Sequence, residues 1–346
     1  MTREVKEGLP WQAWSGSHRR PLWENEERKV KMKYIESIRE GERVSGIYLC
    51  KQRQAAVTKN GKPYENMILQ DKTGQADAKI WDPNSQGIEE FGALDYVEIV
   101  ADATTFQGAL QLNVKRARKA REGEYDPADY LPVSEYDIEV MYRELMNYAN
   151  QVKDPHLRAL LKDLFVDDVE FVKAFKFHSA AKTVHHSFVG GLLEHTLSVC
   201  RLCEYYTKAY PFLNRDLLYT AAICHDIGKV YEISDFPEND YTDVGQLLGH
   251  IAMGSEMVGE RARRIAGFPK KLENELKHCI LAHHGELEYG SPKKPALAEA
   301  MALNLADNTD AKMETLKEIF KSAGQNQGWL GYNRLFESNL RRTTEG

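Results

Sequence analysis

Residues 225–229 read His225-Asp226-Ile227-Gly228-Lys229, at the end of a segment with the apolar spacing of a helix. An adjacent His and Asp at a helix end can place an imidazole nitrogen and a carboxylate oxygen on one divalent cation, and the second carboxylate oxygen remains to reach another. The dipeptide alone is weak evidence, because it arises often by chance. More His and Asp residues, however, stand in or beside predicted helices around it: His195, His250, His283, His284 and Asp307. The whole set offers enough ligands for two metal ions.

From residue 134 onward, apolar residues recur with helical spacing, so the second half of the chain is predicted to be all-α. Ser134, followed three residues later by Asp137, is an acceptable N-terminal cap. Helices are expected over approximately residues 134–152, 155–165, 167–176, 188–209, 214–227, 246–266, 270–284 and 295–322. Helices can aim several side chains at one point, and coordination would satisfy imidazoles and carboxylates that are costly to bury unpaired.

Residues 34–119 instead show the alternation of short β-strands. Strands are expected at about residues 44–49, 64–70, 75–81, 96–103 and 110–114, with turns between them and a short linking segment at 85–91. Five short strands in this arrangement fit a Greek-key barrel of the OB type. Other five-stranded barrels would give much the same pattern.

The chain is therefore predicted to be a multidomain protein, with an N-terminal all-β OB-fold barrel followed by an all-α domain. The expected parts are an N-terminal extension (1–32), the barrel (33–119), a charged linker (120–133), the helical domain (134–325) and a C-terminal tail (326–346). The extension has no apolar signal core, and Met32, just before the barrel, is an alternative start.

The charge is unevenly distributed along the chain. The net charge of −6 argues against indiscriminate binding to nucleic acid. Residues 34–121 carry 13 Lys and Arg against 12 Asp and Glu, whereas residues 122–346 carry 25 against 35. The acidic part contains the candidate metal ligands, where an excess of carboxylates suits cations.

Cysteine content and hydropathy indicate a cytoplasmic protein. The five cysteines are an odd number and no secretory segment is visible, which points to a reducing compartment. Cys200 and Cys203 form a C-x-x-C pair, but they lie in a predicted helix and no second pair exists, so packing is favoured over a zinc or redox site. No segment approaches the roughly 20 apolar residues that span a bilayer, so no membrane association is expected.

The order of the His and Asp residues resembles the HD superfamily of metal-dependent phosphohydrolases, in its histidine-rich form with two metal ions. The resemblance implies two ions that share Asp226. The implied ligands are, for one ion, His195, His225, Asp226 and Asp307, and for the other, Asp226, His250, His283 and His284. Lys229 matches the lysine of the HDxGK motif, which implies a contact with a substrate phosphate. Asp226 and Lys229 are therefore the expected catalytic residues.

Ligand chemistry narrows the choice of metal. Mixed His and carboxylate ligands suit Mn²⁺, Fe²⁺, Co²⁺ or Zn²⁺ better than Mg²⁺ or Ca²⁺, and Mn²⁺ is the expected ion. Two such ions supply an activated water for in-line attack on phosphorus. Peptide hydrolysis is disfavoured because the chain has no H-E-x-x-H motif. Four other histidines are expected to be structural and not metal ligands: His18, His156, His178 and His278.

The predicted barrel suggests a polymeric substrate, because OB barrels bind single strands by stacking bases on aromatic rings while cations follow the backbone. The candidate contacts are Tyr48, Trp81 and Phe106 for bases, and Lys51 and Arg53 for phosphates. For each aromatic residue the competing interpretation is a place in the barrel core, which is the commoner case in a small barrel.

Taken together, residues 33 to about 336 resemble the YhaM-type 3′→5′ exoribonucleases, which join an OB fold to an HD domain. The resemblance is carried by segments such as Asp71-Lys72-Thr73-Gly74, His225-Asp226-Ile227-Gly228-Lys229 and His283-His284-Gly285-Glu286. It implies trimming of single-stranded RNA, and sometimes single-stranded DNA, from the 3′ end with Mn²⁺. His186, upstream of His195, either contacts the substrate or packs internally. Homo-oligomerisation is left open.

Two other functions fit parts of the sequence. One is an HD phosphodiesterase or nucleotidase that acts on small nucleotides, which the barrel and the absence of a GYP signature after His284 disfavour. The other is a non-catalytic RNA-binding protein whose HD domain is an inert scaffold, which the complete set of ligand types disfavours.

Overall fold

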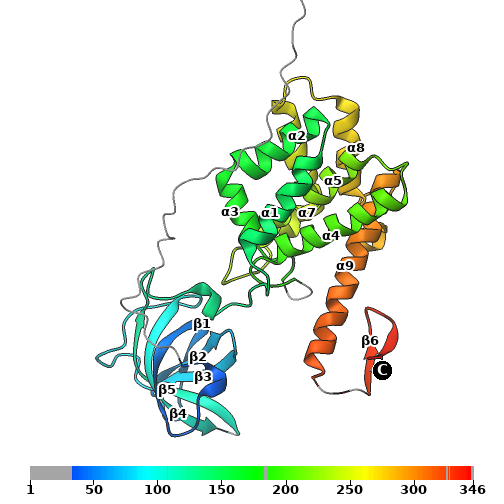
Figure 1. The fold of residues 1–346 in the computed structure, drawn as a ribbon. Coiled ribbons are helices and arrows are strands. Elements are labelled where there is room, and N and C mark those ends of the chain that lie inside the picture. Colours follow the sequence, from blue (N-terminus) through cyan, green and yellow to red (C-terminus); the bar gives the residue numbers. More distant parts are fainter. Residues whose placement is uncertain (1–32, 107, 183–185, 325, 327, 344–346) are drawn as a thin grey trace, which may run out of the picture. The chain divides into compact units, whose positions relative to one another are not determined.

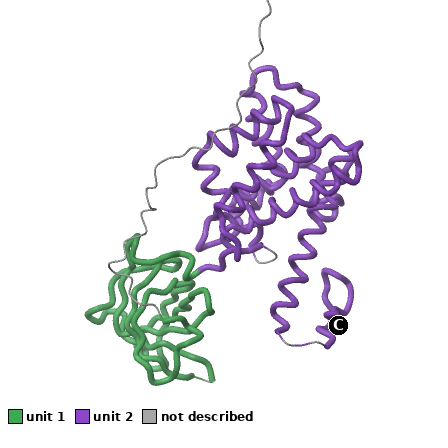
Figure 2. Tube along the Cα trace, viewed as in Figure 1, with its two compact units in different colours: residues 1–130 green, residues 131–346 purple. Residues whose placement is uncertain are grey.

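A closed barrel of five strands occupies the first of the two units into which the chain divides, residues 1–130 and 131–346 (Figures 1 and 2). The computed structural model describes residues 33–106, 108–182, 186–324, 326 and 328–343. The predicted extension, residues 1–32, and His18 within it lie outside the described residues.

The strands follow the order β1-β2-β3-β5-β4 around the barrel. A parallel ladder between β3 and β5 closes it, while every other neighbouring pair is antiparallel. This is the strand order of the OB fold, which confirms the fold predicted for this half of the chain. The strands are β1 Arg43–Val57, β2 Pro63–Asp71, β3 Gly74–Ile80, β4 Tyr96–Phe106 and β5 Ala109–Lys119.

Alternation along each strand places the apolar side chains inside. In β3, for example, Ala76, Ala78 and Ile80 are buried and the residues between them are not. β1 runs further than expected, because after a bulge between Cys50 and Gln52 it continues as a largely exposed strand without an apolar face. Part of the predicted linker packs in this unit as well: the ring centroids of Tyr125 and Tyr96 are 3.8 Å apart.

The second unit consists of helices followed by one short hairpin (Figure 1). The helices are α1 Ile138–Gln151, α2 Pro155–Lys162, a π-helical turn Asp163–Asp167, α3 Val169–Phe177, α4 Gly191–Ala209, α5 Arg215–Cys224, α6 Lys229–Glu232, α7 Asp243–Arg264, α8 Lys270–Leu281 and α9 Ala298–Ser322. Strands β6 Trp329–Asn333 and β7 Ser338–Arg341 form the hairpin, which lies in the segment predicted to be only a tail.

Four helix starts differ from the prediction by three or four residues, and α4 and α9 each begin three residues later, at Gly191 and Ala298. α1 begins four residues later than expected, because the carboxylate of Asp137, not Ser134, accepts the capping hydrogen bond from the Val140 amide. The Ser134 hydroxyl donates to Glu194 instead. α7 begins earlier than expected, at Asp243, where Thr242 caps it.

The helical unit has one apolar core, in which the inward faces of α4 and α5 are completely buried. Cys200, Cys203, Cys224 and Cys279 are free thiols in that core, and Cys50 is a free thiol in the barrel core. This agrees with the expected packing role of the C-x-x-C pair. Among the described residues, none of the helices has the length and apolar character needed to cross a membrane.

Candidate metal centre

The seven residues predicted as metal ligands come together from five parts of the helical unit. His195 lies inside α4, Asp307 lies inside α9, and His250 follows a break in α7. The His225-Asp226 and His283-His284 pairs stand in the turns that directly follow α5 and α8. The break in α7 is at Gly249, whose φ of 73° lies in the left-handed region that favours glycine.

Gly228 explains why the HDxGK motif requires a glycine here. A Cβ at this position would collide with the carbonyl oxygen of His250. The turn after α5 therefore packs directly against the backbone of α7, and this close approach brings His250 to Asp226.

Four of the ligand atoms form a compact first group. His195 Nε2 lies 3.1 Å from His225 Nε2 and 3.2 Å from Asp307 Oδ1. Asp226 Oδ2 lies 3.4 Å from both imidazole nitrogens. An ion with ligand bonds of about 2.0–2.2 Å in tetrahedral geometry separates its ligand atoms by comparable distances, so the group fits one ion.

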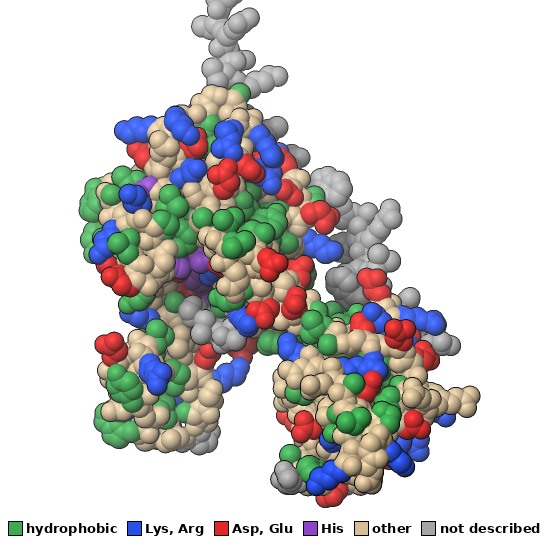
Figure 3. Space-filling view, turned by 180° about the vertical axis from the view of Figure 1, so that it is seen from behind, with side chains coloured by type: hydrophobic (Ala, Val, Ile, Leu, Met, Phe, Trp, Pro, Cys, Tyr) green, Lys and Arg blue, Asp and Glu red, His purple; other side chains and the backbone are tan. Residues whose placement is uncertain are grey.

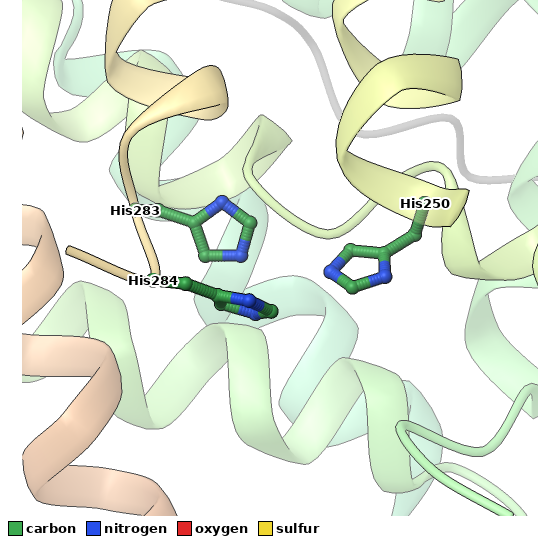
Figure 4. A group of neighbouring side chains, drawn as sticks. All are labelled: His250, His283 and His284. Carbon is green, nitrogen blue, oxygen red and sulfur yellow. The ribbon is translucent and has the colours of Figure 1, made fainter. Parts of the chain in front are cut away.

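The other oxygen of Asp226 faces a second group of three histidines. Asp226 Oδ1 lies 3.5 Å from His250 Nε2 and 3.6 Å from His283 Nε2. One ring nitrogen from each of His250, His283 and His284 lies within 4.8 Å of the others, and the three rings turn toward one another (Figure 4). The Asp226 carboxylate thus stands between the two groups.

Several atoms at the centre are buried without a hydrogen-bond partner. Within the described residues, Asp226 Oδ1, His250 Nε2 and His283 Nε2 have none. Leaving such groups unpaired is costly, and a cation between them would satisfy all three. On this observation the donor set fits metal ions.

The outer nitrogen of each histidine is fixed by an acceptor. Three rings bond through Nδ1 to backbone carbonyls: His225 to Ala222, His283 to Ile280 and His284 to Tyr289, at 2.7–2.8 Å. When Nδ1 carries the proton, Nε2 keeps its lone pair and points into the centre, as metal coordination requires.

The other two histidines are held by carboxylates that the sequence interpretation missed. Asp310 Oδ2 lies 2.7 Å from His195 Nδ1, and Glu232 Oε1 lies 2.9 Å from His250 Nδ1. Each group therefore contains one histidine backed by a carboxylate, an arrangement that orients the ring and raises its basicity. One signal was present in the sequence: Asp310 follows Asp307 by three residues and so shares its side of α9.

The charges at the centre keep Asp226 and His284 in the forms that bind cations. Burial alone would raise the pKa of Asp226, but the Lys229 ammonium, 2.7 Å from Asp226 Oδ2, and the His225 ring hold that pKa well below its ordinary value. Burial and the neighbouring His283 ring lower the pKa of His284 to about 4. Near neutral pH, Asp226 is thus a carboxylate and His284 is a neutral imidazole.

Comparison with known proteins identifies the domain that contains this centre. The HD domain family matches residues 192–312, a range that includes all seven converging residues. The 3'-5' exoribonuclease YhaM of Geobacillus sp. (strain WCH70) is 36% identical over 279 residues, which cover 80% of this chain and 84% of that protein.

The chain belongs to the YhaM family. The resemblance predicted from the sequence is thereby confirmed.

Two solved structures resemble between a quarter and a third of this YhaM-family chain. The second OB-fold domain of replication protein A from Methanococcus maripaludis is 14% identical and covers 26% of this chain and 95% of that chain, with a TM-score of 0.22. The replication factor A related protein from Methanobacterium thermoautotrophicum is 20% identical and covers 30% of this chain and 99% of that chain, with a TM-score of 0.21.

In this YhaM-family chain His186 packs internally. The side chain is buried, and its Nε2 lies 3.0 Å from Asp310 Oδ2, the same oxygen that binds His195. Of the two interpretations left open for His186, this burial and the contact with Asp310 favour internal packing. Two of the histidines expected to be structural also bond to the backbone: His178 to Ser179 and Ile233, and His278 to Ala296.

The predicted barrel contacts divide into two classes. Tyr48 cannot stack on a base, because its ring is completely buried and its hydroxyl donates to the Lys33 carbonyl. Arg53 is held by two hydrogen bonds to Glu65 and by a bond to the Phe91 carbonyl, so its charge is largely neutralised. Trp81 and Phe106, in contrast, are about half exposed, and Lys51 is partly exposed.

Proposed function

We propose that this protein removes nucleotides from the 3′ end of single-stranded RNA at the metal centre of its HD domain. As a YhaM-family protein with an HD domain, the chain is a metal-dependent 3′→5′ exoribonuclease, a hydrolase. The observation that supports the assignment to this centre is the convergence of Asp226 Oδ1, His250 Nε2 and His283 Nε2, which are buried without partners within the described residues.

Two ions are proposed, with Asp226 as the ligand common to both. His195, His225 and Asp307 complete one site, and His250, His283 and His284 complete the other. When bound, the ions supply an activated water and neutralise charge on the phosphoryl oxygens. Lys229 keeps its ammonium beside Asp226, where it is available to a substrate phosphate.

Among divalent cations we propose Mn²⁺, with Fe²⁺, Co²⁺ and Zn²⁺ as the other ions that suit five histidines and two carboxylates. Asp310 and Glu232 support metal binding as such, because carboxylates that accept from metal-binding histidines are common partners in metal sites.

The barrel is proposed to bind the RNA strand ahead of its 3′ end through Trp81, Phe106 and Lys51. The rings of Trp81 and Tyr64 stack with centroids 5.2 Å apart, and Lys79 Nζ lies 5.5 Å from the Trp81 ring. A paired aromatic platform beside a cation suits single-stranded DNA as well as RNA. An RNA substrate and five free thiols suit a cytoplasmic location.

The test is a time course on 5′-labelled single-stranded RNA with Mn²⁺, using the wild type and Asp226→Ala. The expected result is a descending ladder of labelled products that is absent for the variant. Intact RNA with both proteins, together with hydrolysis of a linear or cyclic dinucleotide, would instead support a phosphodiesterase for small nucleotides. RNA binding without hydrolysis of any substrate and without bound metal would support the inert scaffold.

A further inference from the structure

Two of the segments that border the metal centre contain no Lys or Arg. Residues 230–250 lead from Lys229 to His250, and residues 282–292 contain His283 and His284. The first contains five Asp or Glu residues, the second contains two, and neither contains Lys or Arg. Two lysines that reach these segments from elsewhere are neutralised in ion pairs, Lys182 with Asp240 and Lys294 with Glu286. Within the described residues, these two segments therefore offer little to an RNA backbone beyond the neighbouring Lys229.

The same segments expose large hydrophobic side chains. Tyr231, two residues after Lys229, is 51% exposed, and Tyr289, whose carbonyl accepts from His284 Nδ1, is 71% exposed. Leu247 and Leu248, which directly precede Gly249 and His250, are 81% and 61% exposed. Figure 3 shows histidine side chains at the floor of a hollow in the helical unit, with hydrophobic side chains along its edge.

Chain position and one hydrogen bond connect Tyr289 and the two leucines to the metal ligands. The ring centroids of His250 and His284 are 5.2 Å apart, and the η4 turn Leu287–Tyr289 is tied to His284 by its hydrogen bond to Tyr289. A strand whose last phosphodiester reaches the metal centre would therefore run past Tyr289 and the leucines, and Tyr231 stands two residues after Lys229. Its phosphates would meet an acidic surface, whereas its bases would meet aromatic and aliphatic groups.

We propose that the opening of the metal centre binds the 3′-terminal nucleotides of the substrate by their bases, which stack on Tyr289 and Tyr231 and pack on Leu247 and Leu248. This inference rests on the proposed exoribonuclease function. Because every base has a π-face, such a site accepts any sequence. Because it involves few phosphate contacts, its binding depends only weakly on salt, unlike binding through cations.

The experiment compares two RNAs that differ only in their last two residues. In one RNA these residues carry bases. In the other they are abasic but keep ribose and phosphate. The wild type is expected to hydrolyse the base-bearing end about tenfold faster, through a lower KM, as expected for the loss of base stacking. Tyr289→Ala and Tyr231→Ala are expected to slow the base-bearing RNA and to remove most of this preference. The matched control is Tyr210→Ala, an exposed tyrosine directly after the end of α4, 15 residues after His195.

Equilibrium binding of the same RNAs in EDTA reports on the base contacts whether or not a bond is cleaved. A wild type that binds and hydrolyses both RNAs equally would overturn the inference while leaving the exoribonuclease function intact. A base preference that survives in both tyrosine variants would also overturn it. If Leu247→Ser or Leu248→Ser instead changed the molecular mass in solution without altering the base preference, this surface would be an interface between copies. A protein that prefers the base-bearing RNA in binding but hydrolyses neither would contradict the proposed function alone.

Discussion

The metal centre and the nucleic-acid face of the barrel were predicted from the same sequence, but they differ in how specifically their residues can be recognised. Coordination requires His and Asp at a few positions, so residue type and order carry the information. Stacking requires only an aromatic ring on the outside of a strand, and an aromatic core residue looks the same in a sequence. All seven predicted ligands converge, whereas Tyr48, predicted as a platform, lies in the barrel core.

The largest expected effect distinguishes the two regions most sharply. Asp226→Ala removes both carboxylate oxygens that face the two groups of ligands, so hydrolysis of RNA is expected to fall by at least about 10³-fold. Binding of long RNA through the barrel should remain. The measurement combines single-turnover rates, metal content and anisotropy of labelled RNA, with circular dichroism as the control for folding. RNA hydrolysis at a near-normal rate by the folded variant would contradict the assignment of the centre.

A smaller effect is expected from the two carboxylates behind the ligands. Asp310→Asn and Glu232→Gln keep the size of the side chain but weaken the bonds to His195 Nδ1 and His250 Nδ1. Metal affinity is expected to fall about 10–100-fold, as is usual when such partners of metal-binding histidines are lost. Activity should return at high metal concentration.

Titration calorimetry with Mn²⁺ on the metal-free protein measures the affinities. Asp235→Asn, which changes a well-exposed carboxylate of the same unit, is the matched control. An unchanged affinity in both carboxylate variants would mean that backbone packing alone orients the two rings.

Much of the fold followed from patterns of apolar residues, and the exceptions have local causes. The five strands and the long helices were predicted because their alternation and helical spacing are regular. The start of α1 was misplaced because Ser134 and Asp137 are both good caps, and only the folded chain shows that Ser134 bonds to Glu194. The hairpin β6–β7 was missed because its residues are mostly exposed, which leaves no apolar face to recognise.

The same reasoning explains which site residues were missed. Glu232 and Asp310 act through histidines, so their role appears only when the distances are known. His186 was left between two interpretations, and its burial against Asp310 decides between them. Arg53 was predicted to contact a phosphate because the sequence does not show which residue of β2 lies beside it. The register of β1 and β2 places Glu65 there, and the two side chains form an ion pair.

The proposed binding of RNA by the barrel can be tested by replacing its exposed Trp81. Trp81→Ala is expected to raise KM for long single-stranded RNA about tenfold, because it removes a stacking platform, and to leave kcat and the hydrolysis of dinucleotides unchanged. Trp329→Ala, which removes an exposed tryptophan in the hairpin of the other unit, is the control. If dinucleotide hydrolysis fell along with that of long RNA, Trp81 would support folding of the enzyme and not binding of the strand.

The smallest expected effect is a change in the rate at which buried cysteines are alkylated. The five cysteines allow the stability of the two units to be compared in this way. Burial raises the pKa of Cys50, in the barrel, to about 11 and that of Cys279, in the helical unit, to about 12. Both thiols are therefore protonated at pH 8 and react with an alkylating reagent only when their region opens. As the pH rises above 9, the equilibrium shifts toward the open form. Its thiols ionise at their ordinary pKa, whereas the folded thiols, whose pKa is raised, remain protonated.

Mn²⁺ at about three times its Kd should lower the open population of the helical unit about fourfold. Alkylation of Cys200, Cys203, Cys224 and Cys279, followed by mass spectrometry in mild denaturant, should slow by that factor, and alkylation of Cys50 should not. Equal protection of Cys50 would mean that the two units unfold together, so the barrel would be coupled to the metal centre. Protection of neither would mean that the ion is bound as tightly by the open form as by the closed one. Unequal protection would locate the binding free energy in the helical unit alone, as expected if every ligand lies there.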